Sequence, residues 1–329
     1  MLAANDAAIA EAAAWLKRGG LVAMPTETVY GLAADATSDR AVASVYEAKR
    51  RPVFNPLIAH VLDLGAARRE ALFDANAEAL AEAFWPGPLT LVAPIAATCR
   101  ISELARAGLS SVALRAPSHG VARALIAAAG VPLAAPSANL SGHISPTRAE
   151  HVKADLDGRI DLILDDGPTP AGLESTIIAC VEGPPRLLRH GAIAKEEIEA
   201  RLGTKVAEGG AAGGPAAPGM LASHYAPRAA LRLDATDAAG DESALDFGGA
   251  LAKSRASRRL DLSPSGDLTE AAANLFAYLR ALDRTGGVIA VAPIPAGGLG
   301  AAINDRLRRA AAPRGQDLAQ TTTSDVNFA

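Results

Sequence analysis

The chain has 329 residues, a formal net charge of −4 and 50% hydrophobic residues. This length predicts two domains with ample material for a core. No apolar run approaches the ~20 residues of a membrane span, and no basic, then apolar, N-terminal pattern indicates a secretory signal. Neither half carries the strong basic excess of a domain that grips nucleic acid by its phosphates. Cys99 and Cys180 form no C-x-x-C pair, so we expect isolated thiols in a cytoplasmic protein.

Residues 1–205 alternate helical patterns with short apolar runs. The expected strands are 21–24, 57–61, 89–94, 111–115, 133–135, 162–164, 175–180 and 185–188. The expected helices are 6–18, which stops at a glycine pair, and 41–49, 75–84, 121–129, 147–154 and 195–202. This mixture predicts an α/β or α+β domain around one twisted, mixed sheet.

Residues 206–230 are expected to form a flexible linker, because EGGAAGGPAAP can bury little surface. It leads into GMLASHYAPRA, which is unusually specific for a linker. Residues 231–329 are expected to form a small second α/β domain. Its predicted strands are 231–233, 244–247, 260–262 and 287–291, its predicted helices are 267–281 and 301–311, and 320–329 is expected to be a frayed tail.

The strand 21–24 runs directly into PTETVYGL, where two threonines, a glutamate and a tyrosine stand between a proline and a glycine. Ligands in open α/β sheets bind beyond the carboxyl ends of strands. The polar end of this strand therefore indicates the edge of a binding site. Familiar signatures are absent from the sequence: it contains no G-x-x-x-x-G-K-[ST], no H-E-x-x-H and no G-x-S-x-G.

Other polar stretches follow predicted elements, and each has two interpretations. KRRP, from Lys49, is as an isolated feature better explained as a solvated helix end, although arginine forks also bind phosphate at two points. Arg115 ends the strand SVALR and is equally suited to a surface carboxylate or a substrate carboxylate. Ser145 precedes Pro146 as an N-cap and Thr147 with Glu150 fits a capping box, but the same helix start is a ready anion site.

Taken together, PTETVYGL, KRRPVFNPL, SVALR-x-P, SANLSG-x-x-SPT, ESTII and LLRHG occur in the order typical of the YrdC-like family. The chain resembles its L-threonylcarbamoyladenylate synthases, in the longer form that carries SHYAP and a C-terminal domain. His190 is a mild departure, since the family commonly has proline there. The resemblance implies a YrdC-like twisted mixed sheet with helices and a smaller Rossmann-like α/β domain.

The resemblance also implies an activity. L-threonine, bicarbonate and ATP, with Mg²⁺, would give threonylcarbamoyl-AMP and pyrophosphate. Other proteins would transfer the threonylcarbamoyl group to adenosine 37 of tRNA. Two alternatives are a carbamoyl-transfer enzyme, which would carry acylphosphatase and zinc-finger segments that this chain lacks, and a double-stranded RNA-binding module, which the charge balance disfavours.

Carried over residue by residue, the resemblance implies a set of ligands. The threonine pocket would comprise Thr28, His60, Arg115, Ser175 and the carbonyl of Ala135. The ATP ligands would be Arg51, Asn55, Ser111, Ser137, Ser145 and Arg189, with Tyr225 of SHYAP as a lid contact. Lys49 and Arg51 would act on the phosphates, and no protein metal ligand is implied.

Overall fold

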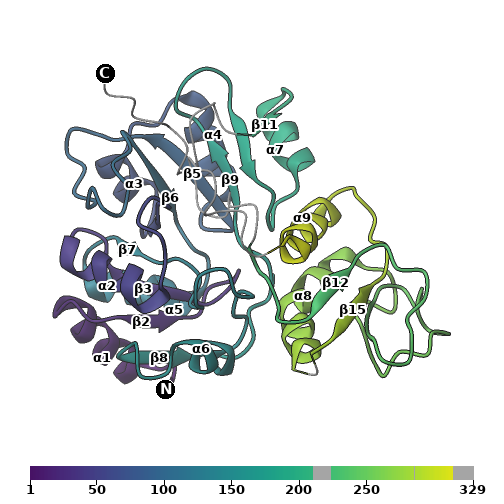
Figure 1. Ribbon diagram of the computed structural model, residues 1–329. Coiled ribbons are helices and arrows are strands. Elements are labelled where there is room, and N and C mark those ends of the chain that lie inside the picture. Colours follow the sequence, from purple (N-terminus) through teal and green to yellow (C-terminus); the bar gives the residue numbers. More distant parts are fainter. Residues whose placement is uncertain (210–223, 285, 314–329) are drawn as a thin grey trace, which may run out of the picture.

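The computed structural model describes residues 1–209, 224–284 and 286–313. Their strands form a mixed sheet of 11 strands and a separate parallel sheet of four (Figure 1). Most of the predicted linker, 210–223, and the whole predicted tail lie outside the described residues. Within the described part of the chain, no helix combines the length and the apolar character that a membrane crossing requires.

The first sheet mixes parallel and antiparallel neighbours, as predicted. In spatial order its strands are β1 (Leu2–Ala3), β8 (Leu162–Asp165), β2 (Val22–Met24), β3 (Gly31–Asp35), β7 (Leu133–Ala134), β4 (Ile58–His60), β6 (Ser111–Arg115), β5 (Leu89–Pro94), β9 (Thr176–Ala179), β10 (Arg186–Arg189) and β11 (Ala207–Glu208). The sequence analysis does not predict β1, β3 and β11. Strand β3 matters most among these, because it joins β2 to β7 in the middle of the sheet.

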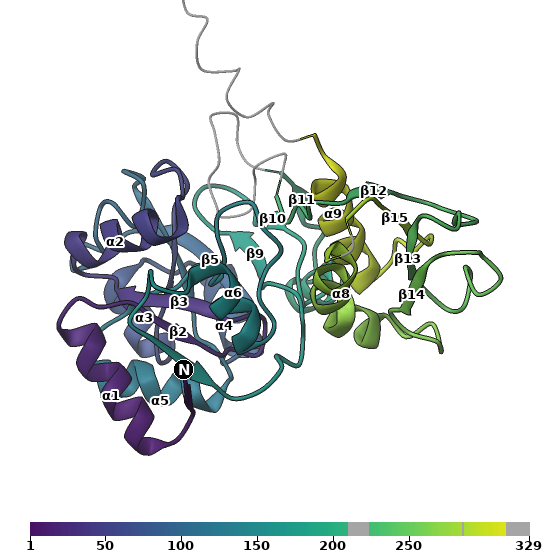
Figure 2. The same ribbon diagram turned by 60° about the horizontal axis from the view of Figure 1, so that its bottom comes forward.

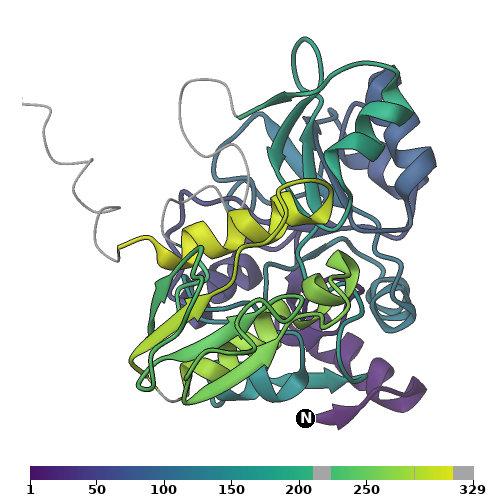
Figure 3. The same ribbon diagram turned by 90° about the vertical axis from the view of Figure 1, so that its right-hand side faces the viewer.

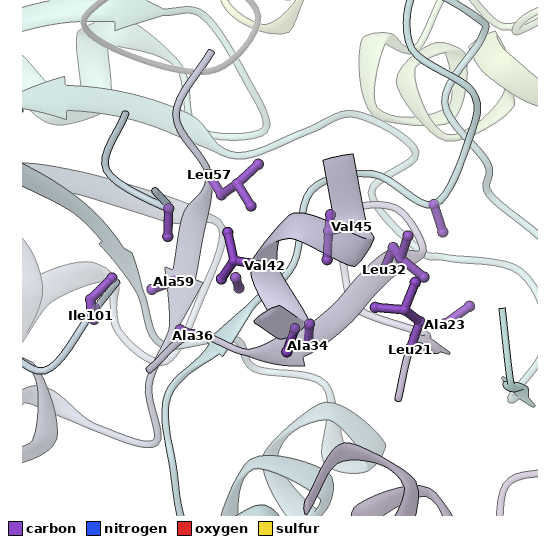
Figure 4. Close-up of a cluster of buried hydrophobic side chains, with 14 of the residues drawn as sticks. Leu21, Ala23, Leu32, Ala34, Ala36, Val42, Val45, Leu57, Ala59 and Ile101 are labelled. Carbon is purple, nitrogen blue, oxygen red and sulfur yellow. The ribbon is translucent and has the colours of Figure 1, made fainter. Parts of the chain in front are cut away.

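Helices cover both faces of this sheet. Helices α1 (Asp6–Lys17) and α5 (Gly120–Ala129) lie side by side on one face (Figure 2). Helix α2 (Asp39–Lys49) covers the other face, where Val42 and Val45 share a buried cluster with Ala23 and Leu32 (Figure 4). The remaining helices of this part are α3 (Leu64–Glu70), α4 (Ala75–Phe84), α6 (Ala149–Leu156) and α7 (Lys195–Leu202). Successive strand residues enter opposite clusters because side chains alternate across a strand.

The second sheet is wholly parallel, as in the Rossmann-like unit that the resemblance implies. Its order is β12 (Ala230–Arg232), β15 (Val288–Val291), β13 (Ser243–Asp246) and β14 (Arg258–Asp261). Helices α8 (Leu268–Asp283) and α9 (Leu299–Ala311) lie between this sheet and the first sheet (Figure 1). In Figure 3, where the second sheet faces the viewer, α9 is the yellow helix that runs toward the strands of the first sheet.

The two parts share a buried apolar cluster. Val29 and Leu173 of the first part are buried in the same cluster as Phe276 of α8. At the edge of this contact Arg280 of α8 forms an ion pair of 2.8 Å with Asp155 of α6. A hydrophobic contact of this kind fixes the second part against the first.

Gly172 permits a close approach between the two parts. A Cβ atom at this position would lie 2.4 Å from the carbonyl oxygen of Ala272 in α8, and its φ is +67°. We expect Gly172→Ala to lower the free energy of unfolding by about 1–3 kcal/mol from the clash, beyond the cost of the left-handed backbone. Gly158→Ala is the matched control, because Gly158 has φ +72° and open space around it. Equal losses in urea denaturation of the two variants would contradict this prediction.

Candidate functional site

The turn after β2 is held by its own threonine. The Thr26 hydroxyl accepts the backbone N–H groups of Thr28 and Val29 and donates to the Val29 carbonyl at 2.6 Å. Such short-range bonds are the usual way in which hydroxyls fix turns. Thr26 therefore shapes the turn, and its oxygen also bonds the Thr28 hydroxyl at 2.8 Å, which has a second partner from elsewhere in the fold.

That partner is Arg115, at the end of β6. Because β4 and β6 are parallel and His60 is in register with Arg115, the two side chains end their strands at the same edge of the sheet. Arg115 donates to the Thr28 hydroxyl at 2.8 Å and forms an ion pair of 2.7 Å with Glu27. Burial alone would favour a protonated Glu27, but the Arg115 charge holds the pKa of that carboxyl below its ordinary value.

A second arginine arrives from β10. Strand β10 is antiparallel to β9, so Arg189 at its end returns to Ser175, the residue immediately before β9. The Arg189 guanidinium donates to the Ser175 carbonyl at 2.9 Å and to its hydroxyl at 3.1 Å. The Ser175 hydroxyl also bonds Thr90 of β5 at 2.7 Å. Burial lowers the pKa of Arg189.

A third arginine follows α2. The Arg51 Nε donates to the Asn55 carbonyl at 3.1 Å and its Nη2 to the Pro56 carbonyl at 3.0 Å. Burial lowers the pKa of Arg51 to about 10, so its guanidinium stays charged at neutral pH. KRRP is thus not simply a solvated helix end, since Arg51 is only 8% exposed while Arg50 is exposed.

These groups line one cavity of about 50 Å³. The lining residues are Thr28, Val29, Arg51, Ile58, His60, Arg115, Ala135, Pro136, Ser137, Glu174, Ser175, Arg189, His224 and Tyr225. Nine residues of the predicted set lie among them. Three buried arginines and several hydroxyls converge on a space that holds one acidic side chain, so the cavity is suited to anions.

Four residues of the predicted set lie outside this lining: Lys49, Asn55, Ser111 and Ser145. The Lys49 Nζ is buried and donates to the carbonyls of Ser137 and Asn139 at 2.5 and 2.6 Å. In this geometry Lys49 supports the SANLSG loop. Ser111 begins β6 whereas Arg115 ends it. Asn55 is buried, and its carbonyl accepts Arg51.

The capping predicted for the helix after SANLSG is wrong. Helix α6 begins at Ala149 with Arg148 as its N-cap, and no side chain caps it. The Ser145 hydroxyl donates instead to the Glu174 carboxylate. A buried carboxylate is the stronger acceptor, so this long-range bond replaces the local one.

The sequence analysis assigned no role to three residues of the site. Glu27 pairs with Arg115, and Glu174 and His224 line the cavity. Each belongs to a motif already quoted, PTETVYGL, ESTII or SHYAP, so the motifs were the available signal. Burial alone would raise the pKa of Glu174, but Arg306 and Arg189 hold it below the ordinary value.

His60 makes the stability of the fold depend on pH. Burial, together with the Arg115 charge, lowers the pKa of His60 to about 3 from 6.5. The unfolded chain therefore binds a proton between pH 6.5 and about 3 that the folded chain does not bind. We expect the free energy of unfolding to fall as the pH drops through this window, by about 1.4 kcal/mol per pH unit from this group.

Urea denaturation between pH 4.5 and 7 measures this slope. His60→Gln is expected to reduce this slope by the share of one histidine, because burial also lowers the pKa of His151, to about 4, and that of His224. His143→Gln, at an exposed position, is expected to change the slope little. An unchanged slope in His60→Gln would contradict the prediction.

The described residues hold no group of three or more acidic, histidine or cysteine side chains that could bind a metal ion. In the cavity Glu174 is the one carboxylate, and it already pairs with Arg306 at 2.9 Å. A resident metal centre therefore does not fit this lining, and a divalent ion would have to arrive with a phosphate-bearing ligand.

Comparison with known proteins agrees with this arrangement. The family model described as "Telomere recombination", for Sua5, YciO and YrdC proteins, matches residues 14–191, and the "Threonylcarbamoyl-AMP synthase, C-terminal domain" model matches residues 193–312. The threonylcarbamoyl-AMP synthase of Bacillus subtilis is 49% identical over 70% of this chain and 68% of its own length. That of Pyrococcus abyssi is 40% identical over 92% and 94%.

The crystal structure of P. abyssi Sua5 complexed with L-threonine superposes with a TM-score of 0.84 over 92% of this chain and 94% of its own. A HypF structure shares the fold alone, at 18% identity and over 30% of its own length. The chain therefore belongs to the Sua5/YrdC family of threonylcarbamoyl-AMP synthases, in its two-domain form.

Proposed function

We propose that this protein is a threonylcarbamoyl-AMP synthase, which converts L-threonine, bicarbonate and ATP into threonylcarbamoyl-AMP and pyrophosphate. The observation that carries the proposal is the convergence of Arg51, Arg115 and Arg189 on one cavity edged by hydroxyls. One substrate of this reaction bears a carboxylate and the other a triphosphate. Curated relatives with this name are 40–49% identical to the chain.

The threonine subsite is assigned to the Arg115 side of the cavity. Arg115 is suited to a carboxylate because its guanidinium forms two-point bonds, and Thr28 already accepts one of its N–H groups. His60 is neutral at physiological pH, so it adds a hydrogen-bonding group without a further positive charge. The Ala135 carbonyl and the Ser175 hydroxyl complete the proposed subsite.

The nucleotide subsite is assigned to Arg51 and Arg189, with Ser137 and Tyr225 in the same lining. Asn55, Ser111 and Ser145 remain proposed ligands of ATP, and Lys49 remains a proposed phosphate contact that would have to exchange its bonds to Ser137 and Asn139. His224 lies beside Tyr225 in this lining, with the two ring centres 4.0 Å apart.

No protein nucleophile is required for the proposed reaction. The threonine amine takes up bicarbonate with loss of water to give a carbamate. A carbamate oxygen then bonds to the α-phosphorus of ATP while the bond from that phosphorus to the departing pyrophosphate breaks. The chain's task is alignment, which can supply about 7–11 kcal/mol of barrier reduction, and stabilisation of phosphate charge by Arg51 and Arg189.

Mg²⁺ is assigned to the bound ATP, because the described residues offer no acidic cluster for it. We place the reaction in the cytoplasm, a choice supported by the free thiols of Cys99 and Cys180.

The product would pass to tRNA threonylcarbamoyl-transfer proteins that modify adenosine 37. The division into 1–205, 206–230 and 231–329 is retained as a proposal alongside this function.

Pyrophosphate release from ATP tests the proposal directly. We expect release only when L-threonine and bicarbonate are both present, and a sharp loss when either is omitted. Release that does not depend on threonine would count against the proposed function. Carbamoyl phosphate in place of threonine and bicarbonate tests a carbamoyl-transfer enzyme, and a salt-dependent shift assay with tRNA tests RNA binding.

A further inference from the structure

Arg306 is a buried cation on helix α9, and its side chain reaches Glu174 in the first part of the chain. Its side chain is fully buried. Its Nε donates to the Glu174 carboxylate at 2.9 Å, and its Nη1 donates to Asp305 at 2.8 Å. An unpaired guanidinium at this depth would be very costly, so these two carboxylates are what allow it to lie there.

Glu174 is the reason that this pair matters for an anion site. Its carboxylate lines the cavity with Arg189, where a negative charge without a partner would repel a phosphate or pair with Arg189. Its second oxygen accepts the Ser145 hydroxyl. Arg306 balances the carboxylate from outside the cavity, because it is absent from the lining.

Tyr225 is the second cavity residue that Arg306 contacts. The Tyr225 ring is fully buried and stacks on Phe276 of α8, with the ring centres 5.5 Å apart. The Arg306 guanidinium carbon lies 5.2 Å from the Tyr225 ring centre, which is within cation–π range. Helices α8 and α9 therefore both hold this ring, whose backbone has a φ of +63°.

We propose that Arg306 is a positioning residue of the nucleotide subsite: from α9 it balances Glu174 and fixes Tyr225, so that the second domain completes the wall which the nucleotide meets. This inference rests on the proposed function. It also gives the second domain a task in ATP binding and none in threonine binding. Burial disfavours the charged guanidinium, yet its neighbours raise the pKa of Arg306, and Glu174 is held ionised; both directions agree with the geometry.

Without Arg306, the Glu174 carboxylate would pair with Arg189 and so compete with the phosphates of ATP for that guanidinium. For Arg306→Gln we expect the KM for ATP to rise roughly 10- to 100-fold, the worth of about one charge-assisted hydrogen bond, while the Kd for threonine stays within about 2-fold. Removing both charges in Glu174→Gln/Arg306→Gln removes that competition. We therefore expect the double variant to recover most of the lost ATP affinity.

The test uses the full-length chain. Pyrophosphate release gives the KM for ATP, and calorimetric titration gives the Kd for ATP and the Kd for threonine. Arg308→Gln is the matched control, since it removes the same charge from the exposed face of α9 and is expected to leave every value unchanged. Recovery in the double variant supports the inference. Two results would overturn it: an equal loss of affinity for ATP and for threonine, or a double variant whose ATP affinity is no higher than that of Arg306→Gln. Either result is expected if Arg306 only stabilises the contact between the two domains. If the wild type binds ATP but releases no pyrophosphate, the proposed function fails, and the ATP Kd values still decide the role of Arg306.

Discussion

Replacing Arg51 by glutamine is expected to reduce pyrophosphate release by about 100- to 1,000-fold, the usual effect of removing one preorganised donor from a site of developing charge. Arg51 lines the cavity and stays charged there. Glutamine is neutral and shorter than arginine, so it cannot offset the negative charge of the phosphates. Threonine binding should be unaffected, because the proposed threonine contacts come from other elements of the sheet.

Arg50→Gln is the control for this experiment. Arg50 is the neighbouring cation, but it is exposed and has no place in the lining. Its replacement removes the same charge from the same motif and should leave turnover near that of the wild type. Thermal denaturation of both variants checks the fold. Near-normal turnover of a folded Arg51→Gln variant would remove Arg51 from the mechanism.

Replacing Arg115 by methionine is expected to abolish threonine binding and also to destabilise the fold. The first effect follows from loss of the proposed carboxylate partner. The second follows from Glu27, whose carboxylate lies 2.7 Å from the Arg115 guanidinium and would be left buried without a cation. Breaking such a buried pair on one side costs about 3–5 kcal/mol.

A double variant separates these two effects. Glu27→Gln/Arg115→Met removes both charges, so we expect most of the lost stability to return in urea denaturation while threonine binding stays absent. Calorimetric titration with L-threonine gives the second readout. Threonine affinity that returns together with stability would show that Arg115 acts only through the fold.

The sequence predicted the strands best where apolar residues were large or β-branched. Strand β5 follows its predicted bounds, 89–94, and β6 follows 111–115. Strand β3 was missed because GLAAD consists mainly of small residues that continue a polar turn. Gly31 suits this strand, since a Cβ there would lie only 3.3 Å from the Ala135 Cβ of the neighbouring loop.

The site was predictable in part for a related reason. An arginine that ends an apolar strand, such as Arg115 or Arg189, reveals its position through the local pattern. The acidic partners do not: Glu27 meets a residue 88 positions along the chain, and Glu174 meets Arg306, which is 132 positions away. Contacts this distant leave no periodicity in the sequence, so only the fold identifies them.

The place of β8 in the sheet has a consequence for synthesis of the chain. Strand β8 pairs with both β1 and β2, although about 140 residues separate it from β2. At roughly 5–20 residues per second, the ribosome needs about 7–30 s to add them. For that interval the outer edge of β2 in the nascent chain has no partner strand, and it is there that we expect chaperones to bind first.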